Sequence, residues 1–454
     1  MEEEKSLVAV ETAVEKNEEI SYGDVLQLAL EVGAGILESG GSVSRVETAV
    51  DRICRAYGIV EVNVAAFPSM IIGGASDING HEHSYMKRIY ATSQNLSLLE
   101  KYNQLSRDIC KNKYHPDEGL KMCYDLAHNK PRNKWLTVVG SALVAGIYSV
   151  FFGGTIADCL PAFLVAFVMA GLNEILSARS LNAYATTFIL SLIGGVLSVS
   201  LCKLLCICGL TVHGSRVMIG TIMILVPGLL TTNAVRDMFT GDLMSGTFQL
   251  LNGVLITLVI AAGYGVAVLM LSPIANFIEP AVRTGWRNYV YFLSSGTLGA
   301  AAVCLFFNMK IKRIGWATLA SLLTLGLYVG VSFGFSETEV FMPIFIATLF
   351  AGVMSEFFAR LIKTPATVIL VPSIIAFVPG SSLYYTVQAM VEGDMAAAGS
   401  WGGVCLLTWL ALAVGICVAT IVFRLIAPVK LKFNRFNRGV SRSPKHKGKN
   451  KRKK

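Results

Sequence analysis

Long apolar runs fill the chain from about residue 135 onward, whereas the first 130 residues alternate apolar and polar positions as soluble proteins do. A membrane-spanning helix needs about 20 apolar residues. The pattern predicts ten spans, near residues 135–153, 158–176, 183–205, 216–233, 247–271, 288–308, 313–333, 340–360, 366–384 and 401–427.

The region before the first span has the spacing of a small α/β domain. Helical periodicity covers residues 21–40, 44–58, 95–113 and 116–128, and short β-branched or aromatic runs predict strands at 60–67, 69–75 and 84–92. Ser44 and Glu47 fit a capping box that would open the second helix. His81 and His83 form an HxH pair, but no third ligand lies beside them, which favours a polar turn over a metal site.

Two stretches of the apolar part repeat the same break. Val226–Asp242 and Val378–Asp394 both begin VPG and end Gly-Asp, with 7 of 17 positions identical at an offset of 152. Upstream, the stretches that begin at Phe188 and Phe345 share 7 of 18 positions at an offset of 157. We therefore predict two copies of a five-helix unit.

Five is an odd number, so the second copy would enter the membrane from the opposite side. Inverted repeats of this kind are typical of transporters that alternate access around a midplane site. A duplication without symmetric function is the alternative interpretation.

The predicted fold is a polytopic α-helical membrane protein in which ten helices form two inverted five-helix repeats after a small cytoplasmic α/β domain. The expected boundaries are a disordered acidic N-terminus (1–20), the α/β domain (21–130), repeat 1 (131–287), repeat 2 (288–429) and a basic cytoplasmic tail (430–454).

Composition supports the membrane assignment, since 54% of the residues are hydrophobic, 15% are charged and the mean hydropathy is +0.58. The net charge of +9 is local, because residues 430–454 carry twelve Lys or Arg and no acid. This tail favours contact with anionic lipid over nucleic-acid binding, since no aromatic residue interrupts its last basic run. The acidic start lacks the apolar core of a signal peptide. We expect both termini in the cytoplasm and the protein in the plasma (inner) membrane.

The ten cysteines include no CxxC pair. Cys202, Cys206 and Cys208 are close enough in sequence for a metal site, but small packing residues in a reducing compartment are the favoured interpretation. No metal or cofactor is predicted.

A Pro-Gly pair inside an apolar span breaks the helix, and broken helices persist in lipid where they face a cavity or other protein. A new helix that starts after the break would offer free N–H groups and a positive dipole end to a carboxylate. The alternative is a helix that simply ends at the membrane surface. The candidate substrate-binding residues are Pro227, Gly228, Thr231, Thr232, Asn233, Arg236, Pro379, Gly380, Ser381, Ser382, Tyr384 and Gln388.

Acids within apolar spans usually bind ions or protons. The candidates for proton coupling are Asp237, Asp242, Asp394, Glu356 and Glu174. For Asp242 and Asp394, capping of the next helix after a glycine turn is an equally good account. The second copy has Gln388-Ala389 where the first has Arg236-Asp237, so the function of charge in this stretch should be asymmetric.

The chain resembles the threonine/serine exporter family. The resemblance rests on GAGILESGGSVSRVETAVDRICRAYG and VEVNVAAFPSMII in the soluble part, and on FFGGTIAD, ILVPGLLTTNAVRDMFTGDLMSG and AFVPGSSLYYTVQAMVEGD in the membrane part. It implies a cytoplasmic domain, ten helices and proton-driven export of threonine and serine. Its motif falls on Pro227, Gly228, Gly241 and Asp242, and on Pro379, Gly380, Gly393 and Asp394.

Three other functions stay open at this point. Relatives with the two halves on separate chains are associated with dicarboxylate export, notably of succinate. A membrane-anchored enzyme would place catalysis in residues 21–130, and a channel would need no proton coupling. We expect a secondary exporter and no enzyme, with a small-molecule substrate, protons and the lipid bilayer as partners. Self-association is left open.

Overall fold

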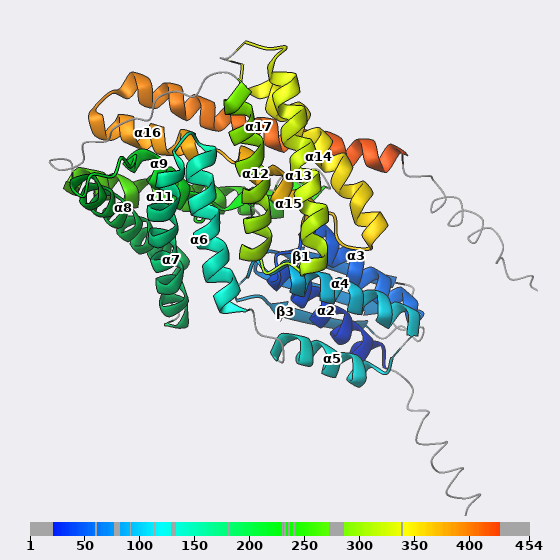
Figure 1. Ribbon diagram of the computed structural model, residues 1–454. Helices are drawn as coiled ribbons and strands as arrows, with labels where there is room; N and C mark the ends of the chain where they lie inside the picture. The colour runs from blue at the N-terminus through cyan, green and yellow to red at the C-terminus, as the bar shows by residue number, and fades with distance from the viewer. Residues whose placement is uncertain are drawn as a thin grey trace, which may run out of the picture.

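The computed structural model describes residues 21–426, except 60, 77–81, 91, 113, 129–132, 180, 229, 231–232, 235–236, 239–240, 272–285 and 337–338. The predicted acidic N-terminus and basic tail lie outside the described residues. Figure 1 shows a small mixed layer at one end of a larger helical body.

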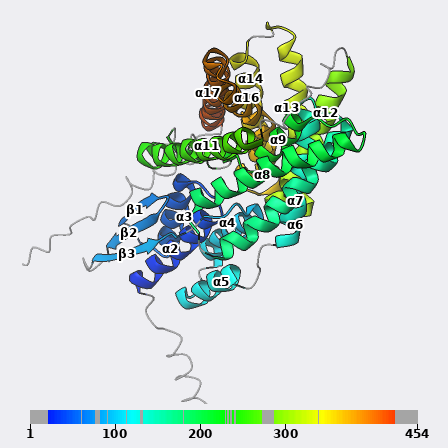
Figure 2. The same cartoon turned by 90° about the vertical axis from the view of Figure 1, so that its left-hand side faces the viewer.

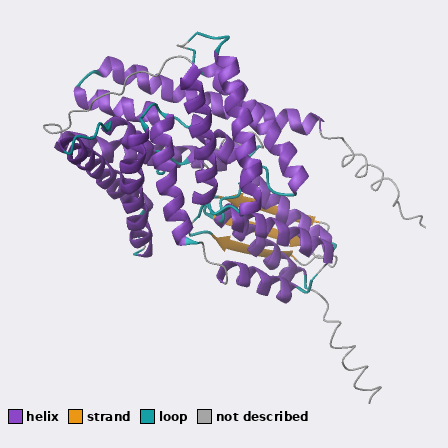
Figure 3. Ribbon diagram, viewed as in Figure 1, coloured by secondary structure: helices purple, strands orange, loops and turns teal. Residues whose placement is uncertain are grey.

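Residues 21–128, called the α/β region below, contain a three-stranded antiparallel sheet in the order β1-β2-β3. Its elements are α2 (Tyr22–Glu38), α3 (Val43–Ala56), β1 (Glu61–Phe67), β2 (Met70–Ser76), β3 (Glu82–Arg88), α4 (Leu96–Asn112) and α5 (Pro116–His128). Helices α2 and α3 pack against the sheet (Figures 2 and 3). Ile71 is fully buried, whereas its neighbour Ile72 is 42% exposed, as the alternation of a strand with one covered face requires. The predicted helices and strands of this region are therefore confirmed.

The predicted capping box at Ser44 is wrong. Helix α3 begins at Val43, with Ser42 as an N-cap residue whose side chain makes no cap hydrogen bond. The Glu47 carboxylate instead accepts a hydrogen bond from Ala66 N (3.0 Å) on β1. The backbone N–H at the start of α3 instead donates a hydrogen bond to a residue from a distant part of the chain, which is described below.

The helical body contains nine spans, among the residues that the structure describes, that are long and apolar enough to cross a membrane, with α15 to α16 counted as one. Its elements are α6 (Lys134–Phe151), α7 (Ile156–Ala178), α8 (Ala183–Ile207), α9 (Gly214–Ile222), α11 (Leu243–Leu271), α12 (Trp286–Phe306), α13 (Ile311–Ser332), α14 (Phe341–Ile362), α15 (Thr367–Ile374), the 3₁₀ turn η1 (Ile375–Phe377), α16 (Gly380–Glu392) and α17 (Met395–Ile426). The predicted span 216–233 corresponds to the short helix α9 and to residues that are only partly described. The protein is thus a polytopic helical membrane protein, and the ten-helix count stays a prediction.

Helix α8 packs against α11 in the way that α14 packs against α17. A methyl group added to Gly263 would overlap Ser191 Oγ, and one added to Gly415 would overlap Thr348 Oγ1. Ser191 and Thr348 are 157 residues apart, and the two glycines are 152 apart. The same close contact between a glycine and a hydroxyl side chain therefore occurs in both stretches. Glycine at this position lets the two helix backbones come close.

The α/β region packs on one end of the helical body. Leu96 N donates to Phe307 O (3.1 Å) at the end of α12. Glu100 accepts ion pairs from Lys310 (3.3 Å) and Arg313 (3.2 Å), at the start of α13.

Candidate functional site

Both VPG motifs interrupt a helix, as the sequence predicts. After each break, the glycine N–H donates to the valine carbonyl two residues earlier: Gly228 N to Val226 O (2.8 Å) and Gly380 N to Val378 O (2.7 Å). The first break follows α9, and the second follows η1 and opens α16. The two copies therefore share the local geometry of the break.

The breaks pack against each other. A Cβ added to Gly228 would lie 3.0 Å from Ile375 Cδ1, and one added to Gly380 would lie 2.6 Å from Met223 Sδ. Met223 and Ile375 are 152 residues apart and therefore occupy equivalent positions in the two stretches. Each glycine thus contacts the equivalent residue of the other stretch. We call this buried arrangement, formed by residues 222–228 and 374–380, the crossing. It brings together the predicted Pro227, Gly228, Pro379 and Gly380, all of which are buried.

The predicted polar residues of the second copy lie along α16. Ser382 is buried and its hydroxyl donates to Pro379 O (3.2 Å), while Ser381 is partly exposed. Tyr384 is buried in an apolar cluster with Tyr264 of α11, and Gln388 donates to Glu392 (2.8 Å). Thr231, Thr232 and Arg236 of the first copy lie outside the described residues.

The Gly-Asp turns also match in backbone geometry. Asp242 N donates to Asp237 O (3.0 Å), and Asp394 N donates to Ala389 O (2.9 Å). Gly241 and Gly393 both have positive φ, at +109° and +80°. The exposed Asp394 caps α17 by accepting a hydrogen bond from Ala397 N (2.9 Å). This is the capping role that the sequence left open for it.

Asp237 and Asn233 contact the α/β region. The fully buried Asp237 accepts hydrogen bonds from Val43 N (3.2 Å), at the start of α3, and from Gln249 Nε2 (2.8 Å). Asn233 Nδ2 donates to Gly40 O (2.9 Å). Asp237 thus provides the cap of α3 that the sequence assigned to Ser44. We call the contact of Asp237 and Asn233 with Gly40 and Val43 the α3 dock.

The α3 dock is rich in carboxyl groups, and it lies outside the helices long enough to span a membrane. Burial raises the pKa of Asp237, although hydrogen bonds from Gln249, Val43 and Ser44 oppose the shift. Burial also raises the pKa of Asp242 and of Glu47, and the pKa of Glu47 is raised further by the charges of Asp242 and Asp237.

A cavity of about 470 Å³ lies where the α/β region meets α6, α7 and α8. It extends to Ile224 and Leu225, directly before the first break. Glu174, a predicted proton-coupling residue, lines it together with Asn173. The remaining predicted acid, Glu356, is half-buried on α14, so the structure does not bring the five predicted acids together.

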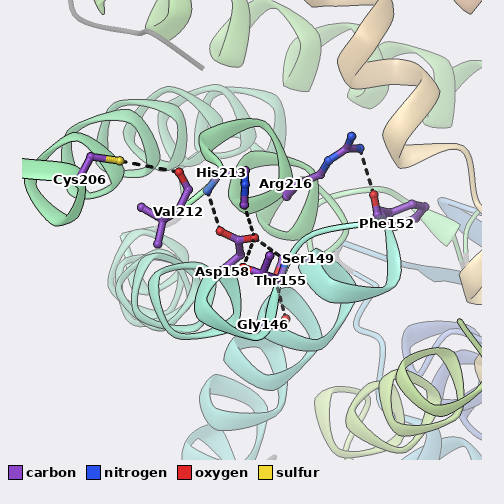
Figure 4. Close-up of polar contacts among 9 residues, drawn as sticks. All are labelled: Gly146, Ser149, Phe152, Thr155, Asp158, Cys206, Val212, His213 and Arg216. Carbon is purple, nitrogen blue, oxygen red and sulfur yellow. Dashed lines mark hydrogen bonds and ion pairs between the residues drawn. The ribbon is translucent and has the colours of Figure 1, made fainter. Parts of the chain in front are cut away.

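A polar cluster that the sequence did not predict joins the start of α7 to the start of α9 (Figure 4). Asp158 is fully buried and accepts from His213 N (2.6 Å) and from Thr155 N (2.6 Å), with His213 Nδ1 at 2.9 Å from its carboxylate. Arg216 donates to Phe152 O (3.0 Å). The Thr155–Asp158 capping box is visible in the sequence, but the His213 partner, 55 residues away, is not.

Arg216 also links the two copies, since its guanidinium donates to Tyr385 OH on α16 (2.5 Å). Tyr385 stacks on Trp401 of α17, with ring centroids 4.8 Å apart. Polar and aromatic contacts therefore connect α9, α16 and α17 through Arg216, Tyr385 and Trp401.

Within the described residues, no three His, Cys, Asp or Glu side chains gather as metal ligands. Cys202, Cys206 and Cys208 are free thiols. His81 of the HxH pair lies outside the described residues.

Together, the apolar helices, the repeated breaks and the one-sided cavity define a multi-pass membrane protein built around a buried crossing. A threonine/serine exporter family model matches residues 27–271, and a second threonine/serine exporter model matches residues 293–422. A threonine/serine exporter of Corynebacterium glutamicum is 22% identical over 419 residues, which cover 88% of this chain and 82% of that protein. No solved structure matches.

The chain belongs to the threonine/serine exporter family, since one family model alone covers more than half of it. It is a transporter of a small molecule and not an enzyme, and its family supports amino-acid export.

Proposed function

We propose that this protein is a secondary active exporter of threonine and serine that works by alternating access around the two VPG breaks. The observation that carries the proposal is the reciprocal contact at the crossing, where Gly228 packs on Ile375 and Gly380 packs on Met223. Broken helices that meet at the interface of inverted repeats are where such transporters bind substrate.

The state of the two ends supports the same mechanism. On the side of the α/β region, a cavity extends to Leu225, close to the first break. At the other end, Arg216 and Tyr385 join the two copies, and His213 pairs with Asp158. A cavity near one end, together with contacts between the two repeated stretches near the other, is what one state of an alternating-access transporter would require.

We further propose that export is coupled to protons through one or more of Asp237, Asp242, Asp394, Glu356 and Glu174. Glu174 and Glu356 are the strongest candidates, because they are half-buried on spanning helices. Asp394 is exposed and caps α17, and Asp237 is held by α3. The protein would lie in the plasma (inner) membrane, with residues 21–130 as a cytoplasmic domain.

Efflux of labelled threonine, serine and succinate from proteoliposomes, with and without an imposed pH gradient, tests the proposal. We expect threonine and serine efflux that the gradient accelerates, and no succinate efflux. Glu174→Gln and Glu356→Gln should identify the carboxyl that couples export to protons. The residual efflux of the variant that lacks this carboxyl should no longer respond to the pH gradient. Efflux of succinate without threonine or serine would show that the proposed substrate is wrong. Wild-type amino-acid efflux that does not change with the pH gradient would show that the proposed proton coupling is wrong.

A further inference from the structure

The cavity beside the first break has hydroxyl, amide and carboxyl side chains among the apolar residues of its lining. Helices α6, α7 and α8 pack side by side (Figure 1) and contribute most of its lining, and Thr92–Gln94 of the α/β region also line it. Its volume of about 470 Å³ falls within the range of small-molecule sites, about 300–1,000 Å³. It is therefore large enough for an amino acid together with water.

The hydroxyl groups in this wall are arranged to accept hydrogen bonds. Ser141 Oγ donates to Val138 O (2.8 Å) on α6, and Thr187 Oγ1 donates to Ala183 O (2.9 Å) on α8. A hydroxyl has a single proton to donate, so while these bonds are made each oxygen can only accept a hydrogen bond from a ligand. Groups of this kind suit a ligand that donates, such as an ammonium or a hydroxyl group.

Glu174 is the only charged side chain among the described residues that line the cavity. Its carboxylate lies 3.7 Å from Lys134 Nζ, which is beyond hydrogen-bond distance. The Lys134 side chain is 69% exposed and the Glu174 side chain is 23% exposed. A loose, partly exposed ion pair contributes about 0–1 kcal/mol, so a ligand ammonium group can compete with Lys134 for the Glu174 carboxylate.

We propose that this cavity is the intake site for the charged head group of an α-amino acid. The ammonium group binds Glu174, and the carboxylate group lies between the displaced Lys134 and the Asn173 amide. A zwitterion brings one charge of each sign, so neither member of the Glu174–Lys134 pair is left buried and unpaired. The ligand hydroxyl of threonine or serine would donate to Ser141 or Thr187.

A dicarboxylate fits this site less well than a zwitterion, because Glu174, the charged side chain in the described lining, would repel its second carboxylate. The position of the site also suits intake. It lies against the α/β region at one edge and contacts Ile224 and Leu225 at the other, so a bound amino acid would be next to the crossing. The inference rests on the proposed function, since it identifies the group by which that function selects its substrate.

Equilibrium binding of labelled threonine to the purified full-length protein tests the site, with proteoliposome efflux measured in parallel. We expect Glu174→Gln to weaken threonine binding by at least tenfold, and Glu174→Asp to recover part of the loss. Lys134→Gln should weaken it by about threefold. Competition by 2,3-dihydroxybutyrate, which has a hydroxyl in place of the ammonium group, should be unchanged by Glu174→Gln.

Glu339→Gln is the matched control, because Glu339 is an exposed carboxyl at the start of α14 and far from the cavity. It should bind threonine as wild type does. Normal threonine binding by a folded Glu174→Gln protein would overturn the intake site. A Glu174→Gln protein that binds threonine normally but exports it slowly would also overturn it, because Glu174 would then act in proton coupling and not in substrate binding. If wild type neither binds nor exports threonine or serine, the proposed function fails first.

Discussion

Gly228 and Gly380 are the residues at which an added methyl group would disturb the crossing most directly. The methyl group would lie 3.0 Å from Ile375 Cδ1 in the first case and 2.6 Å from Met223 Sδ in the second. Both neighbours are flexible side-chain ends, so we expect Gly228→Ala and Gly380→Ala to fold, with an overpacking cost of about 1–3 kcal/mol. If this cost raises the barrier of the conformational step of transport, threonine efflux slows about 5- to 150-fold.

Initial rates of threonine efflux measure this effect. Gly171→Ala on α7 is the control, because an added methyl group there meets no atom within 4 Å. Equal rates in all three variants would mean that the crossing does not rearrange during transport.

The residue scale also marks the limit of what the sequence can predict. The VPG breaks were predictable, because proline and glycine disrupt a helix through their own covalent structure, wherever the chain folds. The cap of α3 was not, because its acceptor, Asp237, lies 194 residues from Val43. Ser44 and Glu47 match a local capping pattern, but a tertiary contact replaces it. The pairing of Asp158 with His213 was hidden in the same way.

Among the elements, the α3 dock gives a structural role to Asp237, an acid at the position where the second copy has Ala389. Among the described residues, the turn of the first copy contacts the α/β region through Asp237 and Asn233, whereas the exposed Asp394 of the second caps α17. Burial raises the pKa of Asp237, Asp242 and Glu47 in the docked protein. A carboxyl whose pKa is higher in the docked state binds protons more tightly there, so docking is favoured below its ordinary pKa and weakens as pH rises through the raised value.

Hydrogen exchange of the amides at residues 43–47, corrected for the intrinsic effect of pH, should therefore become faster as pH rises. Asp237→Asn removes the main titrating group and should flatten this dependence. Asp394→Asn changes the equivalent Gly-Asp turn of the second copy, which ends in an exposed cap, and should behave as wild type. A wild-type exchange rate independent of pH would argue against protonation of the dock.

At the scale of the whole molecule, the recurrence of contacts argues for two copies that keep their own internal packing. Ser191 meets Gly263 in the first copy as Thr348 meets Gly415 in the second, and Gly195 meets Ala267 as Gly352 meets Ala419. Small residues at such contacts allow close and rigid packing of helices in a membrane. Relative motion should then occur between the copies, at contacts such as that of α11 with α16.

A pair of cross-links on one turn of α16 separates these two kinds of contact. A Cβ on Gly265 of α11 would lie 3.3 Å from Val387 Cγ1, so Gly265→Cys with Val387→Cys would join the two copies. A Cβ on Gly402 of α17 would lie 3.8 Å from Thr386 Cγ2, so Gly402→Cys with Thr386→Cys would stay within the second copy. These contacts place each pair of side chains next to each other, as a disulfide requires.

Oxidation should stop threonine efflux in the cross-copy pair, and a reducing agent should restore it. The within-copy pair should keep most of its activity after oxidation, because the disulfide joins helices that move together. Each single-cysteine variant controls for the modification of native thiols, and a mass shift on non-reducing analysis confirms that the bridge has formed. A fully formed cross-copy bridge with normal efflux would exclude motion between α11 and α16, and with it the form of alternating access proposed above, because the crossing is held in place by these two helices.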